Sequence, residues 1–334
     1  MELFKTLFYW LIVGGKKSIP MRLIGFSLLG GSLKYSDQNI LFEWSTNGDE
    51  TLSVLIALIG LIILVSQIID DRKNKAIIIQ HTGIAEIPTM DIDRARPFWE
   101  KVFKATIIHI ECERFYNNGI VKDPQEILKK TESIKESLEN HTRKTNPSYL
   151  KLYYGGLVQV PFAFLAGTIF TNTQVVEVYD WDRINKKWYY LKSLKKSIIQ
   201  LDIEEPKNKI KNKIAIEIEI SYAINRKHTL DVVGNMPILK IKVQKVERDN
   251  CSNIESQKHV AEEFHKILDK YSYVDEINIF VSAQNSMVFN LGRQVSKRVH
   301  PKILVWQYEN KNTLKNPWAV EINSINSIKS KGSV

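Results

Sequence analysis

Two apolar runs of this sequence each end in small and polar residues, which are its best candidates for ligand contact. Small residues let a ligand approach the backbone, and glutamine amides both donate and accept hydrogen bonds. The N–H groups that open a following helix favour phosphate. The alternative is that these turns are small only because a strand packs against a helix there. The candidates are Gly155, Gly156 and Gln159 after the first run, and Ser282, Gln284 and Ser286 after the second.

Four further residues have side chains suited to a nucleotide-like ligand. His81 and Thr82 follow the apolar run 75–80, where the imidazole could bind phosphate or could belong to an ordinary turn. Tyr179 and Tyr308 end two other β-branched runs, where a phenol ring could stack on a base. All four are therefore added to the candidate ligand-binding residues.

The sequence lacks the arrangements that catalysis needs. It has no P-loop, HExxH or GxSxG motif and no nuclease-like group of carboxylates. Asp91, Asp93 and Glu100 lie in a proline-flanked amphipathic stretch and are predicted to cap a helix. Cys112 and Cys251 show no metal-ligand spacing. We therefore expect a protein that is not an enzyme, with no catalytic residues, no metal site and no cofactor.

The candidate turns lie in a sequence repeat, in which residues 152–191 match 277–320 when Gly167 is aligned with Gly292. Each copy contains an apolar run, a small or polar turn, a helical pattern and a β-branched run. That order is typical of a strand–turn–helix–strand unit in a parallel sheet, which binds ligands at the turn after the first strand. The same alignment pairs Gln159 with Gln284 and Phe164 with Phe289.

Upstream elements repeat as well, because the apolar run 75–80 matches 213–220 and each copy then has a charged helical pattern. The fold expected is therefore α/β, with two Rossmann-like halves at residues 74–205 and 206–326 and a tail at 327–334. A pseudo-twofold pair of such halves is expected to place its two ligand turns at one shared cleft.

Residues 1–73 are predicted to form a membrane module. The run 51–69 is uncharged, apolar on all sides and about as long as a helix that crosses a hydrocarbon core, so we expect a transmembrane α-helix there. A second transmembrane α-helix is expected at about 18–35. Residues 1–15 are expected to form an interfacial helix with one apolar face.

Flanking charge predicts the orientation of this module. Arg72, Lys73 and Lys75 follow the second apolar run, whereas the connection 34–50 is mainly acidic. Basic residues remain on the cytoplasmic side of a membrane. We therefore expect a multi-pass membrane protein with its N-terminus and its large C-terminal part in the cytosol.

The overall charge leaves two interpretations open. The chain of 334 residues carries a net charge of +10, and most of it lies beyond residue 75. The partner of the C-terminal part could be anionic, or the surface could simply be rich in solvated lysines. The lysine-rich run 192–213 is expected to be a solvated connection between the two halves.

The second copy of the repeat resembles a known family. The stretch FVSAQNSMVFNLGRQV, followed by LVWQY and NPWAV, is similar to the C-terminal signature of SAVED domains. The resemblance covers about residues 75–325 and implies two fused CARF-like Rossmann halves, in agreement with the repeat. Gly155–Gly156–Leu157 depart from the pattern, because a small polar residue would be expected there. With two transmembrane helices in front, the chain resembles the 2TM-SAVED effectors of bacterial CBASS antiphage systems.

That resemblance implies an antiviral function at the bacterial inner membrane. The SAVED domain would lie in the cytosol and bind a cyclic tri- or tetranucleotide made by a CD-NTase-type nucleotidyltransferase. Ligand binding would drive homo-oligomer formation and disrupt the lipid bilayer. Two alternatives remain: a membrane-tethered nucleic-acid-binding or scaffold protein, and an enzyme with a nucleotide cofactor. The lysines do not interleave with aromatic residues, which disfavours the first, and the absence of GxGxxG disfavours the second.

Overall fold

The computed structural model describes residues 58–63, 75–90, 105–143, 150–170, 175–191, 198–247, 250–323 and 326–330. The chain divides into two compact units, one formed by residues 1–75 and 96–104 and the other by 76–95 and 105–334. In the first unit, the structure describes residues 58–63, which are helical, and Lys75, which opens a strand.

The predicted membrane segments fall almost entirely outside the described residues. This holds for the helices expected at 1–15 and 18–35, and for all of 51–69 except residues 58–63. Across the residues that the structure describes, no helix combines the length and the apolar character needed to cross a bilayer.

The first half of the larger unit is built on a five-stranded sheet with the order β2-β1-β5-β6-β7. Strands β1 and β2 pair in parallel, as do β5 and β6, whereas β7 runs antiparallel to β6. The bounds are Lys75–Thr82 for β1, Ala105–Glu111 for β2, Leu150–Leu157 for β5, Val176–Asp182 for β6 and Lys187–Tyr190 for β7. A separate hairpin pairs β3 (Tyr116–Asn117) with β4 (Ile120–Val121) after the short 3-10 helix η2 (Glu113–Phe115).

The second half is built on a seven-stranded sheet with the order β14-β13-β12-β11-β9-β10-β8. Its four central strands are parallel, and β8, β13 and β14 pair antiparallel at the two sides. The bounds are Leu201–Glu204 for β8, Lys213–Glu219 for β9, Ile238–Val243 for β10, Glu276–Ser282 for β11, Lys302–Trp306 for β12, Trp318–Ile322 for β13 and Ser327–Ser330 for β14.

The two sheets have one topology, which confirms the predicted repeat of strand–turn–helix–strand units. In each sheet, the strand pair that comes first in the sequence (β1 with β2, and β9 with β10) lies beside the pair that comes later (β5 with β6, and β11 with β12). Two segments lie differently from the sequence prediction. Strand β8, placed in the first half and the lysine-rich connection, pairs with β10, and β14 lies in the sheet although the sequence predicts a tail from residue 327.

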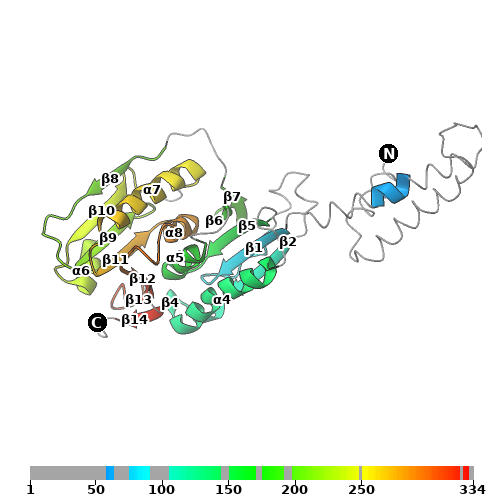
Figure 1. Ribbon diagram of the computed structural model, residues 1–334. Helices are drawn as coiled ribbons and strands as arrows, with labels where there is room; N and C mark the ends of the chain where they lie inside the picture. The colour runs from blue at the N-terminus through cyan, green and yellow to red at the C-terminus, as the bar shows by residue number, and fades with distance from the viewer. Residues whose placement is uncertain are drawn as a thin grey trace, which may run out of the picture. The chain divides into compact units, whose positions relative to one another are not determined.

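Four of the helices form a layer between the two sheets, with α5 and α8 at its centre (Figure 1). The charged helices α4 and α7 begin at polar caps, where Asp123 accepts from the Glu126 N–H at 3.0 Å and Asn253 from the Ser256 N–H at 2.8 Å. The bounds are Pro124–Thr142 for α4, Val160–Ile169 for α5, Ile254–Lys270 for α7 and Asn285–Gly292 for α8, and α6 (Arg226–Val233) packs on the other face of the second sheet.

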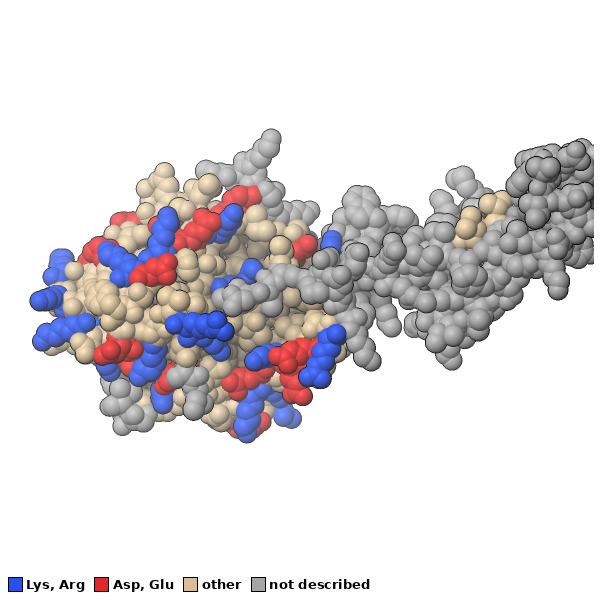
Figure 2. All heavy atoms as spheres, viewed as in Figure 1, with Lys and Arg blue, Asp and Glu red and all other residues tan. Residues whose placement is uncertain are grey.

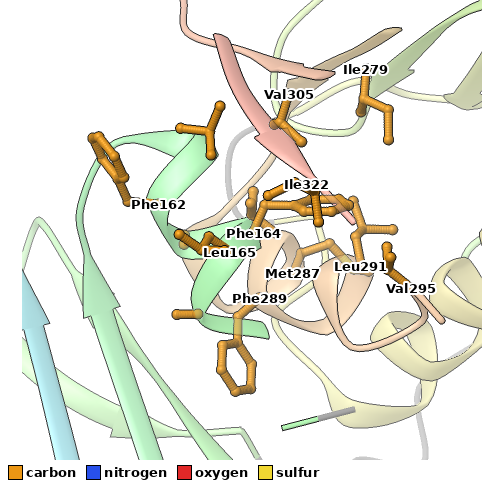
Figure 3. Packing of buried hydrophobic residues seen from close by; sticks show 14 of the residues in the cluster. Phe162, Phe164, Leu165, Ile279, Met287, Phe289, Leu291, Val295, Val305 and Ile322 are labelled. Atoms are coloured by element: carbon orange, nitrogen blue, oxygen red, sulfur yellow. The ribbon is translucent and has the colours of Figure 1, made fainter. Parts of the chain in front are cut away.

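Helices α5 and α8 cross at the two glycines that align the repeat. A Cβ atom on Gly167 would overlap the carbonyl oxygen of Phe289, and one on Gly292 would overlap that of Phe164. Each glycine therefore meets the phenylalanine of the other copy, as a pseudo-twofold relation requires. Phe289 also stacks on Tyr154 with ring centroids 3.9 Å apart, within the apolar core shown in Figure 3.

Candidate ligand-binding site

In each sheet, the connections that follow two adjacent strands lead to opposite sides of the sheet. Ligands of α/β sheets bind at the carboxyl ends of such a pair of strands. In the first sheet this pair is β1 and β5, and in the second it is β9 and β11. The predicted turns lie at the ends of these two pairs. They follow β5 and β11, and Gln159 and Gln284 precede the helices α5 and α8 with nearly equal backbone angles.

The backbone around the two turns is held in the same way. The carbonyl oxygen of Leu157 accepts from the N–H groups of Gly83 at 2.9 Å and Ile84 at 3.2 Å. The carbonyl oxygen of Ser282 accepts from Ile220 and Ser221, both at 2.9 Å. The two turns therefore share their backbone scaffold and differ in their side chains.

The turn in the first half is closed. Gln159 is only 2% exposed, and its Nε2 donates to the carbonyl oxygen of Gly83 at 2.7 Å. The N–H of Val158 donates to Oδ1 of Asn285 in the second half at 3.0 Å. The amide of Gln159 thus fills the space between the ends of β1 and β5, where a ligand would have to enter.

The two glycines of this turn are small for packing reasons. A Cβ atom on Gly155 would overlap the side chain of Met90, and one on Gly156 would lie 2.7 Å from Oη of Tyr154. Both positions lie inside the protein, so the structure does not support the prediction that these glycines line a ligand cleft. The alternative, that the turn consists of small residues because other side chains pack closely against it, accounts for both glycines.

The turn in the second half is more open and more polar. Ser282 and Gln284 are both partly exposed. Oε1 of Gln284 accepts from the N–H of Cys251 at 3.1 Å, whereas its Nε2 has no hydrogen-bond partner among the residues that the structure describes. After the neighbouring strand β9, Oγ of Ser221 also lacks a partner among the described residues, although Ser221 is only 6% exposed. Unpaired buried polar atoms are costly unless something else binds them. Oε1 of Gln159 in the first turn is unpaired as well, so the second turn differs in being partly exposed and in leaving a donor unpaired.

Ser286 does not face that site. Its hydroxyl group is fully buried, donates to Oδ2 of Asp180 at 2.8 Å, and accepts from Nε2 of Gln257 at 2.8 Å. Asp180 belongs to β6 of the first half, so Ser286 connects the two halves. The prediction that Ser286 contacts the ligand directly is therefore not supported.

His81 lies within β1 and not in a turn. Its ring is fully buried between Oη of Tyr154, 3.2 Å from Nδ1, and Oγ1 of Thr131, 3.4 Å from Nε2. Burial lowers the pKa of His81 to about 3, so the imidazole is neutral and carries no charge for a phosphate. Thr82 is also buried. Both residues belong to the core rather than to an exposed ligand edge.

The two candidate tyrosines lie in different environments. Tyr179 is buried against Tyr153 and Tyr190, with ring centroids 6.2 and 5.5 Å away. Tyr308 is 49% exposed at the end of β12, and its ring lies 6.1 Å from that of His228. Of the two, Tyr308 alone presents a ring on which a base could stack.

Sequence reasoning missed Ser221 as a site residue. Ser221 and Tyr222 directly follow the run 213–220, which matches the run 75–80, and neither residue is among the candidates. The useful signal was the repeat itself, because the residues after β1 and after β9 must meet their respective turns. Tyr222 is exposed. Nδ2 of Asn250 donates to the carbonyl oxygen of Ile220 at 3.0 Å, which helps to hold the backbone that follows β9.

One group among the described residues has the composition of a metal site, namely His265, Asp269 and His300. Nδ1 of His300 accepts from the N–H of Ser296 at 3.0 Å, so the proton of the neutral ring lies on Nε2. Nε2 faces Oδ1 of Asp269 at 3.1 Å and donates to it. With its lone pair already used at Nδ1, His300 serves as a hydrogen-bond bridge and does not suit a metal ion.

On the face shown in Figure 2, charged side chains do not mark a binding site. Over the face shown in Figure 2, Lys and Arg side chains alternate with Asp and Glu. Some of the positive charge is neutralised locally, since Nζ of Lys240 lies 2.9 Å from Oε1 of Glu219 and Arg226 pairs with the buried Glu217 at 3.0 Å. In this view, the net charge of +10 does not gather into a basic patch.

A family model matches residues 127–322, which extend from within α4 to the end of β13. Its description is "SMODS-associated and fused to various effectors sensor domain", abbreviated SAVED. The match covers more than half of the chain, so the protein belongs to the SAVED family. The resemblance found in the second copy of the repeat is thereby confirmed.

The chain is also similar to solved Cap4 SAVED/CARF-domain containing receptors. The receptor from Acinetobacter baumannii with the cyclic trinucleotide 2'3'3'-cAAA is 13% identical, with a TM-score of 0.47 and coverage of 78% of this chain and 57% of that one. The receptor from Moraxella osloensis is 14% identical, with a TM-score of 0.47 and coverage of 86% and 63%. This chain thus spans less than two thirds of either receptor. A search of curated proteins found no match.

Proposed function

We propose that this protein is a non-enzymatic receptor for a cyclic oligonucleotide, which it binds at the end of β9 and β11. The observation that carries the proposal is the unpaired Nε2 of Gln284 at this point of a sensor-family domain. A free, fixed donor at that point suits an acceptor atom of a phosphate or a base edge. The unpaired hydroxyl oxygen of Ser221, whose N–H donates to the carbonyl oxygen of Ser282 at 2.9 Å, supplies a second polar contact.

The remaining contacts follow from the chemistry of a cyclic tri- or tetranucleotide. Ser282 is partly exposed next to Gln284 and offers a hydroxyl group, while the exposed ring of Tyr308 offers a stacking surface for one base. The helix N-terminus of α8 adds N–H groups that favour phosphate. The closed turn of the first half contributes little polar surface, so recognition falls mainly on the second half.

The proposal includes no chemical step on the ligand. The groups at the site are an amide, hydroxyls and a phenol, without an adjacent base that would activate a nucleophile. His81, a natural candidate for a general base, is buried and neutral. The ligand would therefore leave the site unchanged.

The proposed effect of ligand binding is disruption of the bacterial inner membrane. The apolar run 51–69 and the basic residues after it support an anchored protein with the SAVED domain in the cytosol. Two short spans cannot enclose a pore alone, so disruption of the bilayer would require a homo-oligomer. The ligand, made by a CD-NTase-type nucleotidyltransferase, must then bind the assembled state more tightly than the free one.

Calorimetry on the full chain in detergent tests the receptor function directly. A panel of cyclic tri- and tetranucleotides is titrated, with the linear oligonucleotides of the same composition as controls. We expect saturable binding of at least one cyclic compound and a much weaker response to its linear form. The proposal fails if the folded protein binds none of the panel, or binds linear and cyclic forms equally.

Light scattering of the same samples tests the output. Particle size should grow when the binding compound is added and should stay constant with the linear control. If liposomes become leaky while the protein keeps its size, then assembly is not the mechanism.

A further inference from the structure

A buried hydrogen-bond network leads from Gln284 into the first half of the domain. Its centre is Gln257 on α7, which is almost fully buried. Nε2 of Gln257 donates to the carbonyl oxygen of Cys251 and to Oγ of Ser286, both at 2.8 Å, while its Oε1 accepts from Nδ2 of Asn290 at 2.6 Å. The amide of Gln257 thus has a partner at both ends, which fixes its orientation.

One branch of this network orients Gln284. Gln257 holds the carbonyl of Cys251, and the N–H of Cys251 donates to Oε1 of Gln284. A glutamine amide has one oxygen and one NH2 group. Because its oxygen is engaged by Cys251, Gln284 presents its NH2 group to the proposed ligand site.

The other branch reaches the first half. Ser286 donates to Oδ2 of Asp180, which closes β6 against α8. The carboxylate of Asp180 is held from its own strand as well, since Oδ1 accepts from the N–H of Trp181 at 2.9 Å. A shift of β6 relative to α8 would therefore act on Ser286, and through Gln257 on Gln284.

The equivalent acid of the other half has different partners. Glu309 aligns with Asp180 in the repeat, and its Oε1 accepts from the N–H of Val121 at 3.0 Å and from Nε1 of Trp318 at 3.1 Å. The first of these bonds also joins the two halves, because Val121 lies in β4 of the first half, whereas Trp318 in β13 belongs to the same half as Glu309. Gln159, however, donates to Gly83 of its own half. Glu309 therefore provides a matched control for Asp180: a second contact between the halves that runs along another route.

We infer that Gln257 and Ser286 are positioning residues, which hold the donor of Gln284 toward the ligand and couple ligand binding to the contact between the two halves. The inference rests on the proposed function and adds to it a route from the site to β6. A substitution that breaks these hydrogen bonds should weaken ligand binding without removing any atom that touches the ligand.

The test measures ligand affinity of the full chain in detergent for Ser286→Ala, with Glu309→Gln as the matched control. The cyclic compound used is the one that binds the wild-type protein in the titration above. We expect Ser286→Ala to weaken binding by about 2- to 12-fold, the equivalent of one hydrogen bond. Glu309→Gln should change the melting temperature but not the affinity. Ser286→Thr, which keeps the hydroxyl group, should restore most of the affinity.

Hydrogen exchange at the Cys251 amide supplies a readout that loss of stability alone would not move. The ligand should slow this exchange in the wild-type protein and in Glu309→Gln, and should slow it much less in Ser286→Ala. Asp180→Asn, which keeps an acceptor oxygen, serves as a second variant with a smaller effect in the same direction. Equal effects of Ser286→Ala and Glu309→Gln on affinity, or no effect of either, would overturn the inference while leaving the receptor function intact. Absence of binding to the wild-type protein would instead refute the receptor function.

Discussion

The turns after β5 and after β11 share their backbone hydrogen bonds and differ in the partners of their side chains. In both, one carbonyl oxygen at the strand end accepts two consecutive N–H groups, and a glutamine precedes the next helix. In the first turn the glutamine side chain bonds back to Gly83, and the end of the strand is apolar at Leu157. In the second, Ser282 replaces Leu157, and the glutamine is held so that its donor remains unpaired.

This comparison shows how a duplicated unit can divide its tasks. The packing role and the proposed ligand role compete for the same position, since a glutamine amide that is buried against its own backbone is not accessible to a ligand. In the proposal made above, the first copy supplies packing and the second supplies the polar site. The four predictions below test this division, beginning with the largest expected effect.

A glutamate at each turn should separate packing from binding. Gly156→Glu would place a charge against the buried Tyr154, and an unpaired buried charge costs several kcal/mol, so this variant should fail to fold. Ser282→Glu should fold, because Ser282 is partly exposed, but should repel an anionic ligand. Circular dichroism and calorimetry measure the two effects. A folded Gly156→Glu variant that has lost only binding would show that the first turn is part of the site.

The helix crossing should respond equally from both copies. Gly167→Ala and Gly292→Ala each place a methyl group into a backbone carbonyl of the other helix, so each should lower the free energy of unfolding by about 3 kcal/mol or more. Denaturant unfolding is the measurement. Ala85→Val, on an exposed loop, should have little effect. A large difference between the two glycine variants would contradict the pseudo-twofold packing.

The paired glutamines should give opposite phenotypes. Gln284→Leu removes the proposed ligand donor and should weaken binding by about tenfold, with a smaller change in stability. Gln159→Leu leaves the carbonyl of Gly83 without its donor, so it should cost about 1–3 kcal/mol of stability and keep the affinity. Calorimetry and thermal unfolding on both variants decide the matter. Equal losses of affinity would mean that both turns contact the ligand.

The buried histidine of the first half should make stability depend on pH. The pKa of His81 is lowered in the folded protein, so the unfolded chain binds the proton first as the pH falls below about 6.5. The folded state should then lose about 1 kcal/mol between pH 6.5 and 5.5, with further loss toward pH 3. His81→Gln should remove this part of the slope, and His109→Gln, on an exposed position of β2, should not. An unchanged slope in His81→Gln would contradict a neutral buried ring.

The sequence alone determined the repeated strands and helices of the two halves, because the local pattern of each copy indicates them, although it did not place β8 and β14 in the second sheet. Apolar runs such as 75–80 and 213–220 became the central strands β1 and β9, and the charged patterns became α4 and α7. The alignment of Gly167 with Gly292 also predicted the equivalence that the helix crossing displays. Patterns of this kind predict the folded structure, because the period of the apolar residues determines which face of an element is buried.

Only the tertiary structure distinguishes the side-chain partners of the two turns. Gln159 and Gln284 are the same residue type at the same place in the repeat, and no local pattern reveals that one amide reaches Gly83 while the other is held by Cys251. Likewise, Ser286 resembled a ligand contact until Asp180, more than a hundred residues earlier in the chain, proved to be its partner. Hydrogen-bond partners of buried side chains come from distant segments. A side chain's freedom to bind a ligand is therefore set by how the two halves pack, and not by its neighbours in sequence.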